Sequence, residues 1–412
     1  MTQRIVITGL GVVSPLGIGK EAFSKNICSG VSGVRPISLF DTADFDAQTA
    51  AEITDFAPEQ YVGKKGLRLL DRSTKLTLCA AHLALDDSGV SVTDDNTKEI
   101  GLVLASTFGS LSSISNFDRE ALLEGPQYVN PALFSNTVIN SPASQACIKY
   151  GIRGFSATIS TGFGASLDAL HYAAYSIRAG RARIVLAGGV EELCIQIFLG
   201  FYKSGLLSIK SERLTEEIRP FDRERNGFVI GEGAVFLVLE ELRSAEARGA
   251  RIYAEMSGYG SGFTPHCTSR YSPGPEGLKR AMRQALVHGK LVPGDIDCVF
   301  AAANGSPKGD RFEAEAIRNV FSKESSRPTI TAVKSMLGET YSAGGSFAAA
   351  AALCALERQM VPPTLHHVTP DPSCTVSSLA TAPHAHSLRH VLVNAAGPGG
   401  NNSSLVFSKD FG

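Results

Sequence analysis

Short runs of consecutive apolar residues, many of them β-branched, alternate along this chain with longer segments of helical periodicity. Short apolar runs bounded by turn residues are typical of buried strands, whereas apolar residues three or four apart indicate one face of a helix. Continuous apolar strands separated by helices predict an α/β protein whose sheets are covered on both faces. The expected strands span residues 5–8, 101–106, 184–187, 235–239, 299–302, 329–333, 390–394 and 405–408.

Three segments carry the strongest helical patterns. Residues 75–88 have one apolar stripe, and residues 167–177 and 346–356 are apolar almost all round, which is typical of helices buried on every side. A turn of small residues, at 162–166 and 342–346, precedes each of the two buried helices. This repetition predicts an internal structural duplication.

A Pro- and Gly-rich stretch, residues 261–277, interrupts the pattern soon after the helical segment 240–249. Such a composition favours turns and connections. It predicts a seam between two halves of unequal length, for which we expect residues 1–250 and 251–412.

Length and charge exclude several functional classes. The 412 residues suffice for one large or two fused compact units, and 39 Lys and Arg against 40 Asp and Glu leave a net charge of −1. This balance provides no basic field for nucleic acid or an anionic membrane. The longest apolar run, 347–356, is half of the roughly 20 residues that a membrane span needs. We expect a protein that binds neither nucleic acid nor a membrane.

Two further observations bear on the compartment. The chain opens directly with a strand pattern and lacks the charged and apolar regions of a secretory signal. Its eight cysteines show no CxxC spacing, as expected in a reducing compartment. Together these patterns predict a cytoplasmic protein.

Cofactor and metal motifs are weak. Gly9 and Gly11 follow the first strand as in a dinucleotide fingerprint, but the third glycine and the later acidic residue are missing, so a tight turn is favoured. The pairs at 366–367 (two histidines) and 266–267 (His and Cys) have no second ligand pair at workable spacing. We therefore expect neither a cofactor nor a metal.

Several longer motifs resemble those of the β-ketoacyl synthases, the condensing enzymes of fatty acid and polyketide synthesis. They are the opening RIVITGLGVVSPLG, the AGG at 187–189 followed by Glu191, the dense loop 219–234, the VKSMLG at 333–338, and the NAAGPGGNN at 394–402. The likeness runs from residue 2 to about residue 408. It implies a thiolase-like fold, an α/β five-layered αβαβα sandwich made of two related halves, and a protein that works as a dimer.

The resemblance also implies where the reacting groups of active members lie. These enzymes resemble one another in a Cys–His–His set, in which the thiolate attacks an acyl thioester and the two imidazoles promote decarboxylation of malonyl thioester. The corresponding positions here hold Phe163, Asn304 and Glu339. A phenyl ring cannot be acylated, an amide cannot exchange a proton near neutral pH, and a carboxylate would repel developing negative charge. No catalytic residue is therefore expected.

The residues around these positions are expected to be structural. Lys334 precedes Glu339 by five residues, and we predict that the two pair in the buried former site, because either charge alone would be costly there. Ser160, Thr161 and Ser166 flank Phe163 but have no histidine at a recognisable place to serve as a base, so capping of the turn and helix is favoured.

One branch of the family shares this pattern. Residues 164–170 and 304–310 resemble the chain length factors, the inactive β subunits of type II polyketide ketosynthases. The resemblance implies heterodimerisation with an active ketosynthase α subunit, contact with an acyl carrier protein through that complex, and a tunnel that limits polyketide length. Most members carry Gln where Phe163 stands, and this departure argues against a malonyl decarboxylase role.

Further site residues follow from the resemblance. The segment after the strand 101–106 is expected to cross the dimer interface, so Phe108, Ser112 and Phe117 are tunnel candidates, with ordinary interface packing of the two rings equally favoured. Pro398 stands where active enzymes place a Phe gate, and its rigid φ does not suit a swinging loop.

A basic cluster and two other functions stay open. Lys64, Lys65 and Arg68 occupy a position at which condensing enzymes dock the carrier protein, although a solvated face is favoured here. An active condensing enzyme with an unusual site, and a homodimeric acyl-binding protein, remain alternatives.

Overall fold

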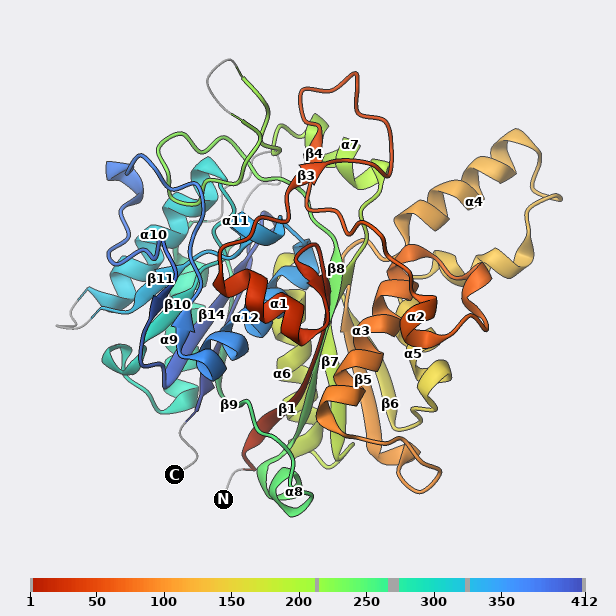
Figure 1. The fold of residues 1–412 in the computed structure, drawn as a ribbon, viewed down its shortest axis with the longest axis horizontal. Coiled ribbons are helices and arrows are strands. Elements are labelled where there is room, and N and C mark those ends of the chain that lie inside the picture. The colour runs from red at the N-terminus through yellow and green to blue at the C-terminus, as the bar shows by residue number, and fades with distance from the viewer. Residues whose placement is uncertain (1–2, 212–214, 266–273, 323–326, 410–412) are drawn as a thin grey trace.

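A computed structural model describes residues 3–211, 215–265, 274–322 and 327–409 (Figure 1). The eleven strands of its large sheet include every strand expected from the apolar runs. They are β1 (Ile5–Ser14), β2 (Gly17–Ile18), β5 (Ile100–Ala105), β6 (Phe155–Ile159), β7 (Ile184–Glu191), β8 (Gly233–Glu241), β9 (Ala254–Phe263), β10 (Cys298–Phe300), β11 (Thr329–Thr331), β14 (His390–Ala396) and β15 (Asn401–Ser408).

The strand order repeats itself. The first half runs β6-β5-β7-β8-β1 and the second runs β11-β10-β14-β15-β9. In each half the first three strands are parallel and the last two join antiparallel. A short antiparallel pairing of β1 with β9, at residues 6–7 and 254–255, connects the halves. The repeated order and direction confirm the predicted duplication.

Helices fill the layers between and outside the two half-sheets (Figure 1). Two helices pack between the halves, and other helices cover the outer face of each half. The predicted α/β sandwich of two related halves is therefore confirmed. The central pair is α6 (Ala165–Arg178) and α12 (Gly344–Arg358); the outer helices include α3 (Arg72–Ser88), α5 (Ser141–Tyr150), α9 (Glu276–Gly289) and α10 (Pro307–Phe321).

The remaining helices are shorter or lie at the periphery. They are α1 (Lys20–Cys28), α2 (Glu59–Val62), α4 (Leu111–Leu123), α7 (Ile195–Lys203), α8 (Leu242–Ala247) and α11 (Lys334–Leu337). Of these, α4 projects away from the body of the molecule (Figure 1). None of its 13 residues is buried within this chain.

The N-termini of the two central helices meet. The backbone N–H of Ser346 donates to the hydroxyl of Ser166 at 2.8 Å. A Cβ atom at Gly345 would lie 2.8 Å from Leu167, so only a glycine allows this approach. The two small-residue turns that precede these helices are thereby placed side by side, in the centre of the molecule.

The turn expected at Gly9 and Gly11 is wrong. Strand β1 continues through both glycines to Ser14 and is buried along its whole length. A Cβ atom at Gly11 would lie 2.0 Å from the carbonyl oxygen of Ala80 in α3. Because these glycines have no Cβ atom, they allow helix α3 to approach strand β1 closely, and they do not form a turn.

The seam expected at residues 261–277 is also misplaced. Residues 261–263 close β9 and residues 276–277 open α9, so this stretch lies inside the second half, and its residues 266–273 are outside the described residues. The sequence pattern does not predict strand β9, because glycines at alternate positions interrupt its apolar residues. A Cβ atom at Gly260 would lie 2.1 Å from the oxygen of Ala281 in α9. The division at 250 and 251 stays a prediction, and it falls between α8 and β9.

Candidate functional site

Three positions far apart in the sequence meet where the central helices begin. Phe163 lies in a 3₁₀ turn, Gly162–Gly164, between β6 and α6. Asn304 follows β10, and Glu339 follows α11. A matching 3₁₀ turn, Tyr341–Ala343, precedes α12 in the second half.

A buried polar cluster centres on Glu339. Its Oε2 atom accepts hydrogen bonds from Lys334 Nζ at 2.7 Å and from Asn304 Nδ2 at 2.7 Å. Its Oε1 atom accepts from the N–H of Tyr341 at 2.9 Å. The side chain of Glu339 is fully buried and that of Lys334 is 7% exposed, so the predicted Lys334–Glu339 pair is confirmed.

The ring of Phe163 closes the other side of this cluster. Lys334 Nζ lies 6.0 Å from the centre of the Phe163 ring, which allows a cation–π attraction. The ring also packs against Tyr341 at 5.5 Å and against Phe201 at 6.5 Å between centroids. Gly397 leaves room for it, since a Cβ atom there would lie 2.7 Å from Phe163 Cβ. The position thus holds a packed apolar side chain.

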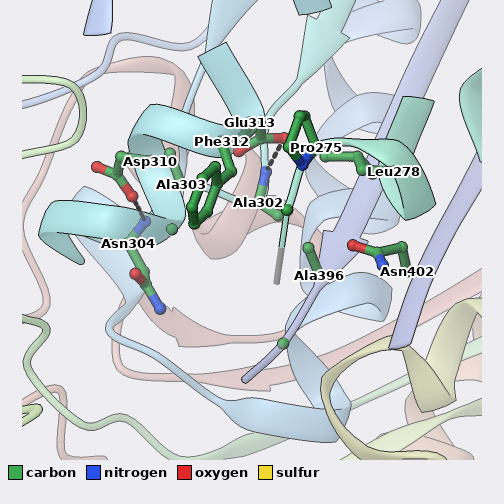
Figure 2. Close-up of a pocket in the computed structure, with 13 residues that line it drawn as sticks. Pro275, Leu278, Ala302, Ala303, Asn304, Asp310, Phe312, Glu313, Ala396 and Asn402 are labelled. Carbon is green, nitrogen blue, oxygen red and sulfur yellow. Dashed lines mark hydrogen bonds between the residues drawn. The ribbon is translucent and has the colours of Figure 1, made fainter. Parts of the chain in front are cut away.

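Two buried carboxyl groups support the Asn304 side of the cluster. Asp310 accepts hydrogen bonds from the N–H groups of Asn304 at 3.0 Å and Gly305 at 3.1 Å, and burial raises its pKa to about 6. Glu313 accepts from the N–H of Ala302 at 2.9 Å, and burial raises its pKa to about 7. Figure 2 shows both hydrogen bonds that these groups make with the strand end at 302–304.

Little empty space remains beside these groups. The cavity drawn in Figure 2 has a volume of about 30 Å³ and is bordered by Asn304, Asp310, Glu313 and Gly397 among others. A buried water needs roughly 10–15 Å³ measured in this way, so the cavity has room for about two or three waters. It cannot hold an acyl thioester.

The three tunnel candidates, Phe108, Ser112 and Phe117, lie in different surroundings. Phe108, at the end of β5, packs edge-on against Tyr341 at 5.3 Å and Phe201 at 5.9 Å, and so joins the aromatic group around Phe163. Phe117, on α4, contacts Phe134 at 6.1 Å instead. Ser112 uses its hydroxyl and its N–H for hydrogen bonds to Glu192 at 2.9 and 3.0 Å.

Comparison with known proteins decides the family. Residues 2–245 match the family described as "Beta-ketoacyl synthase, N-terminal domain", and residues 253–368 match "Beta-ketoacyl synthase, C-terminal domain". The chain belongs to the β-ketoacyl synthase family.

Curated members of the family align with almost the whole chain. The chain is 34% identical over 414 residues to 3-oxoacyl-[acyl-carrier-protein] synthase 2 of Vibrio cholerae, which covers 99% of each protein. It is 32% identical over 410 residues, again 99% of each, to the enzyme of the same name from Coxiella burnetii. Both relatives are named as synthases.

Solved β-ketoacyl synthase structures share the fold. The ishigamide ketosynthase/chain length factor superposes with a TM-score of 0.92 at 32% identity over 100% of both chains. A type II polyketide acyl-carrier protein in complex with its ketosynthase gives 0.89 at 28% identity over 99% of each chain. The thiolase-like fold expected from the sequence is confirmed.

The hydroxyl groups near the family's nucleophile position are engaged in structure. Thr161 donates to Asp168, and Ser166 caps the neighbouring helix α12 through Ser346 rather than its own helix. Among the described residues, no three His, Cys, Asp or Glu side chains gather as a metal site requires. His366 lies 3.3 Å from Glu217, and the pair at 266–267 is outside the described residues.

The last sequence candidates lie at the surface or in a turn. Pro398 is half-buried between β14 and β15, where the N–H of Gly400 donates to the oxygen of Gly397 at 3.1 Å. Lys64, Lys65 and Arg68 are exposed.

No helix within the described part of this β-ketoacyl synthase homologue has both the length and the apolar character of a membrane span.

Proposed function

We propose that this chain is the non-catalytic subunit of a ketosynthase heterodimer, a chain length factor of a type II polyketide synthase. The observation that carries the proposal is the packed ring of Phe163 at the position where active members place the nucleophilic cysteine. Carbon–carbon bond formation by this family needs an acylated thiol, and a benzyl side chain offers none.

The residues at the two other positions, Asn304 and Glu339, also argue against catalysis by this chain. The carboxylate of Glu339 accepts hydrogen bonds from Lys334, Asn304 and the N–H of Tyr341, so it is held as a structural anion. The amide of Asn304 has no proton to exchange near neutral pH. Neither group can bind and polarise the carbonyl of a malonyl thioester as an imidazole pair would.

Surface features support a protein partner. Strand β6 ends the order of the first half-sheet, and a sheet edge that is left unpaired is a template for another strand. Apolar side chains on and near α4 and α5 are strongly exposed in this chain: Leu122 is 85%, Leu123 73% and Ile148 74% exposed. Contiguous exposed apolar surface marks interaction sites. We propose that a ketosynthase α subunit covers this surface.

The partner complex would supply the chemistry and the carrier protein. One similar structure is described as a ketosynthase/chain length factor, and another as an acyl-carrier protein bound to its ketosynthase. By analogy, this cytoplasmic chain completes the tunnel of its partner through the segment that carries Phe108, Ser112 and Phe117. The acyl carrier protein meets the complex rather than this subunit alone.

An active condensing enzyme is the second candidate. It is favoured by the curated relatives, which are 31–34% identical and named as synthases. In such an enzyme some other nucleophile would have to replace Phe163. The third alternative, a homodimeric acyl-binding protein, is opposed by the small volume beside the polar cluster.

Acylation separates these functions. The purified chain is incubated with an acyl-acyl carrier protein and its intact mass is measured, with the Vibrio cholerae synthase as the positive control. A chain length factor stays unmodified while the control gains one acyl group. Acylation of this chain at any residue, followed by condensation with malonyl carrier protein, would establish the active enzyme instead.

Co-purification tests the partner. The chain is co-expressed with a type II ketosynthase α subunit, and the mass of the intact complex is measured. We expect a one-to-one heterodimer and a chain that is unstable when expressed alone. A stable homodimer in the presence of the α subunit contradicts the proposal.

A further inference from the structure

Strand β7 ends at Glu191, and both Glu191 and the next residue, Glu192, are almost completely buried. Glu191 is 0% and Glu192 1% exposed. Within the described residues neither carboxylate has a cationic side chain in ion-pair range. Burial raises the pKa of Glu191 to about 8 and that of Glu192 to about 7. Burying two carboxyl groups side by side is energetically unfavourable unless hydrogen bonds replace those that each group made with water.

Four of their six hydrogen bonds go to residues 107–112, which run from just after β5 into the first turn of α4. Glu191 Oε1 accepts from the N–H of Thr107 at 2.5 Å, and its Oε2 lies 3.4 Å from the N of Phe108. Glu192 Oε1 accepts from the N–H of Ser112 at 3.0 Å and from its hydroxyl at 2.9 Å. The two carboxyl groups therefore hold both ends of residues 107–112.

The start of the segment is also held by the Phe108 ring, which packs on Tyr341 and Phe201, and by the N–H of Gly109, which donates to the Ser106 hydroxyl at 2.9 Å, whereas α4 itself is weakly attached. Helix α4 buries none of its residues in this chain, and its N-cap residue, Ser110, makes no side-chain cap hydrogen bond. The first N–H groups of a helix need an acceptor from elsewhere. Glu192, the residue after β7, supplies it and so caps α4 in place of Ser110, at the end of the helix that favours a negative group.

The same carboxyl groups tie the segment to the former site. Glu191 also accepts a hydrogen bond from the hydroxyl of Ser342, the neighbour of Tyr341. Tyr341 contacts both Phe108 and Phe163. Glu192 Oε2 accepts from the N–H of Ser73 at the start of α3, at 3.3 Å. Glu191 and Glu192 thus connect residues 107–112, the turn at Ser342 and the start of α3, close to the N-terminal end of α4.

From this geometry we infer that Glu191 and Glu192 are positioning residues that set the placement of Phe108 and α4, and thereby determine the length of the product. The inference rests on the proposed function, because the segment limits chain growth only if it lines the partner's tunnel. Glu191 and Glu192 act through Phe108 and Ser112 and need not touch the growing chain.

Glutamine at position 192 is a sharp test. Both oxygens of Glu192 accept from N–H or O–H donors, so an amide must turn its NH₂ group toward Ser112 or toward Ser73. If the NH₂ group faces Ser112, the hydrogen bond from the Ser112 N–H is lost. If it faces Ser73, the bonds from Ser112 remain but go to a neutral oxygen, which accepts more weakly than a carboxylate, and in both cases the volume hardly changes. The matched control is Glu240→Gln, because Glu240 is also fully buried, lies on the adjacent strand β8, and binds Arg248 rather than the segment.

The first measurement is hydrogen–deuterium exchange in the full chain as purified. In Glu192→Gln we expect the amides of residues 107–123 to exchange about tenfold faster, the effect of losing roughly one hydrogen bond. The control leaves this segment unchanged. Should Glu192→Gln fold poorly, Ser112→Ala removes only the hydroxyl, and Ser112→Thr restores it. Unaltered exchange in both Glu192→Gln and Ser112→Ala overturns the positioning role.

The second measurement is the product-length distribution of the complex with the α subunit. A shifted distribution in Glu192→Gln, with the Glu240→Gln control like the wild type, supports the inference. Faster exchange with an unshifted distribution overturns the claim on product length. If the wild-type complex makes no polyketide at all, the proposed function has failed, whereas the exchange result still decides whether these carboxyl groups position the segment.

Discussion

At the scale of single residues, the polar cluster around Glu339 is stabilised by a buried ion pair. Lys334 and Glu339 are both buried, and each would be costly without the other. Asn304 shares the same oxygen of Glu339, and the Phe163 ring covers Lys334. Lys334, Asn304 and Glu339 thus form one hydrogen-bonded polar group under the ring of Phe163.

Breaking this pair should destabilise the fold strongly. Lys334→Met leaves the Glu339 carboxylate buried without its cation, and such losses typically cost about 3–5 kcal/mol. The double variant Lys334→Met/Glu339→Gln should lose less than Lys334→Met alone, because no buried charge remains. Urea unfolding of the three proteins measures the effect. A single variant within about 1 kcal/mol of wild type would show that the pair is not buried as described.

Glu313 predicts a dependence of stability on pH. Burial raises its pKa from 4.5 to about 7, so the folded protein binds an extra proton between these values. The contribution of this group is complete below about pH 4.5 and is lost as the pH rises through 7. Glutamine keeps both hydrogen bonds, because Oε1 accepts from Ala302 and Asn394 while Oε2 has no partner.

We therefore expect Glu313→Gln to equal wild type near pH 5 and to be more stable by about 1–3 kcal/mol at pH 8. Urea unfolding at several pH values measures this difference. The exposed control Glu246→Gln should show a difference that does not change with pH. A Glu313→Gln difference that is equally flat would mean that Glu313 is ionised in the fold.

At the scale of elements, the connection from β5 to α4 links the aromatic group around Phe163 to the projecting helix. Its first ring, Phe108, belongs to the aromatic group with Phe201 and Tyr341, whereas Phe117 lies on the projecting helix against Phe134. The connection therefore has one end at the former site and the other at the surface proposed for the partner.

Replacing either ring by alanine should lengthen the product of the complex, because a side chain that closes the tunnel is removed. Product mass from the reconstituted heterodimer measures this. Phe45→Ala is the control, since Phe45 packs on Phe198 and Tyr202 rather than on this connection. Unchanged product length in a stable complex would leave Phe108 and Phe117 as packing residues.

At the scale of the whole molecule, the two halves repeat one strand order but differ in what they expose. The first half ends in β6 and carries α4 and α5 with their exposed apolar side chains. The central helices place the two equivalent turns, at Phe163 and Tyr341, in contact. The duplicated fold thus has the cluster around Phe163 and Tyr341 at its centre and the proposed partner surface at one side.

A charge on that surface should prevent assembly. Leu123→Asp places a carboxylate where an apolar side chain that is 73% exposed would be covered by the α subunit. Burying an unpaired charge is strongly unfavourable, so we expect at least a tenfold loss of affinity. The matched control is Val287→Asp on α9, which is 77% exposed on another element. Analytical ultracentrifugation of the mixed subunits measures both, and equal affinities would place the interface elsewhere.

The sequence by itself determined eight strands of the large sheet, though not β6 or β9, together with the central helices, the duplication and the Lys334–Glu339 pair. Local apolar periodicity and the cost of a lone buried charge act over few residues and can therefore be read from the chain. Only the tertiary structure decided the rest. Gly11 and Gly260 act as strand residues because a helix backbone lies within van der Waals range of each. Glu191 and Glu192 acquired their partners from a segment about 80 residues earlier, and such contacts depend on how distant strands pair rather than on any local pattern.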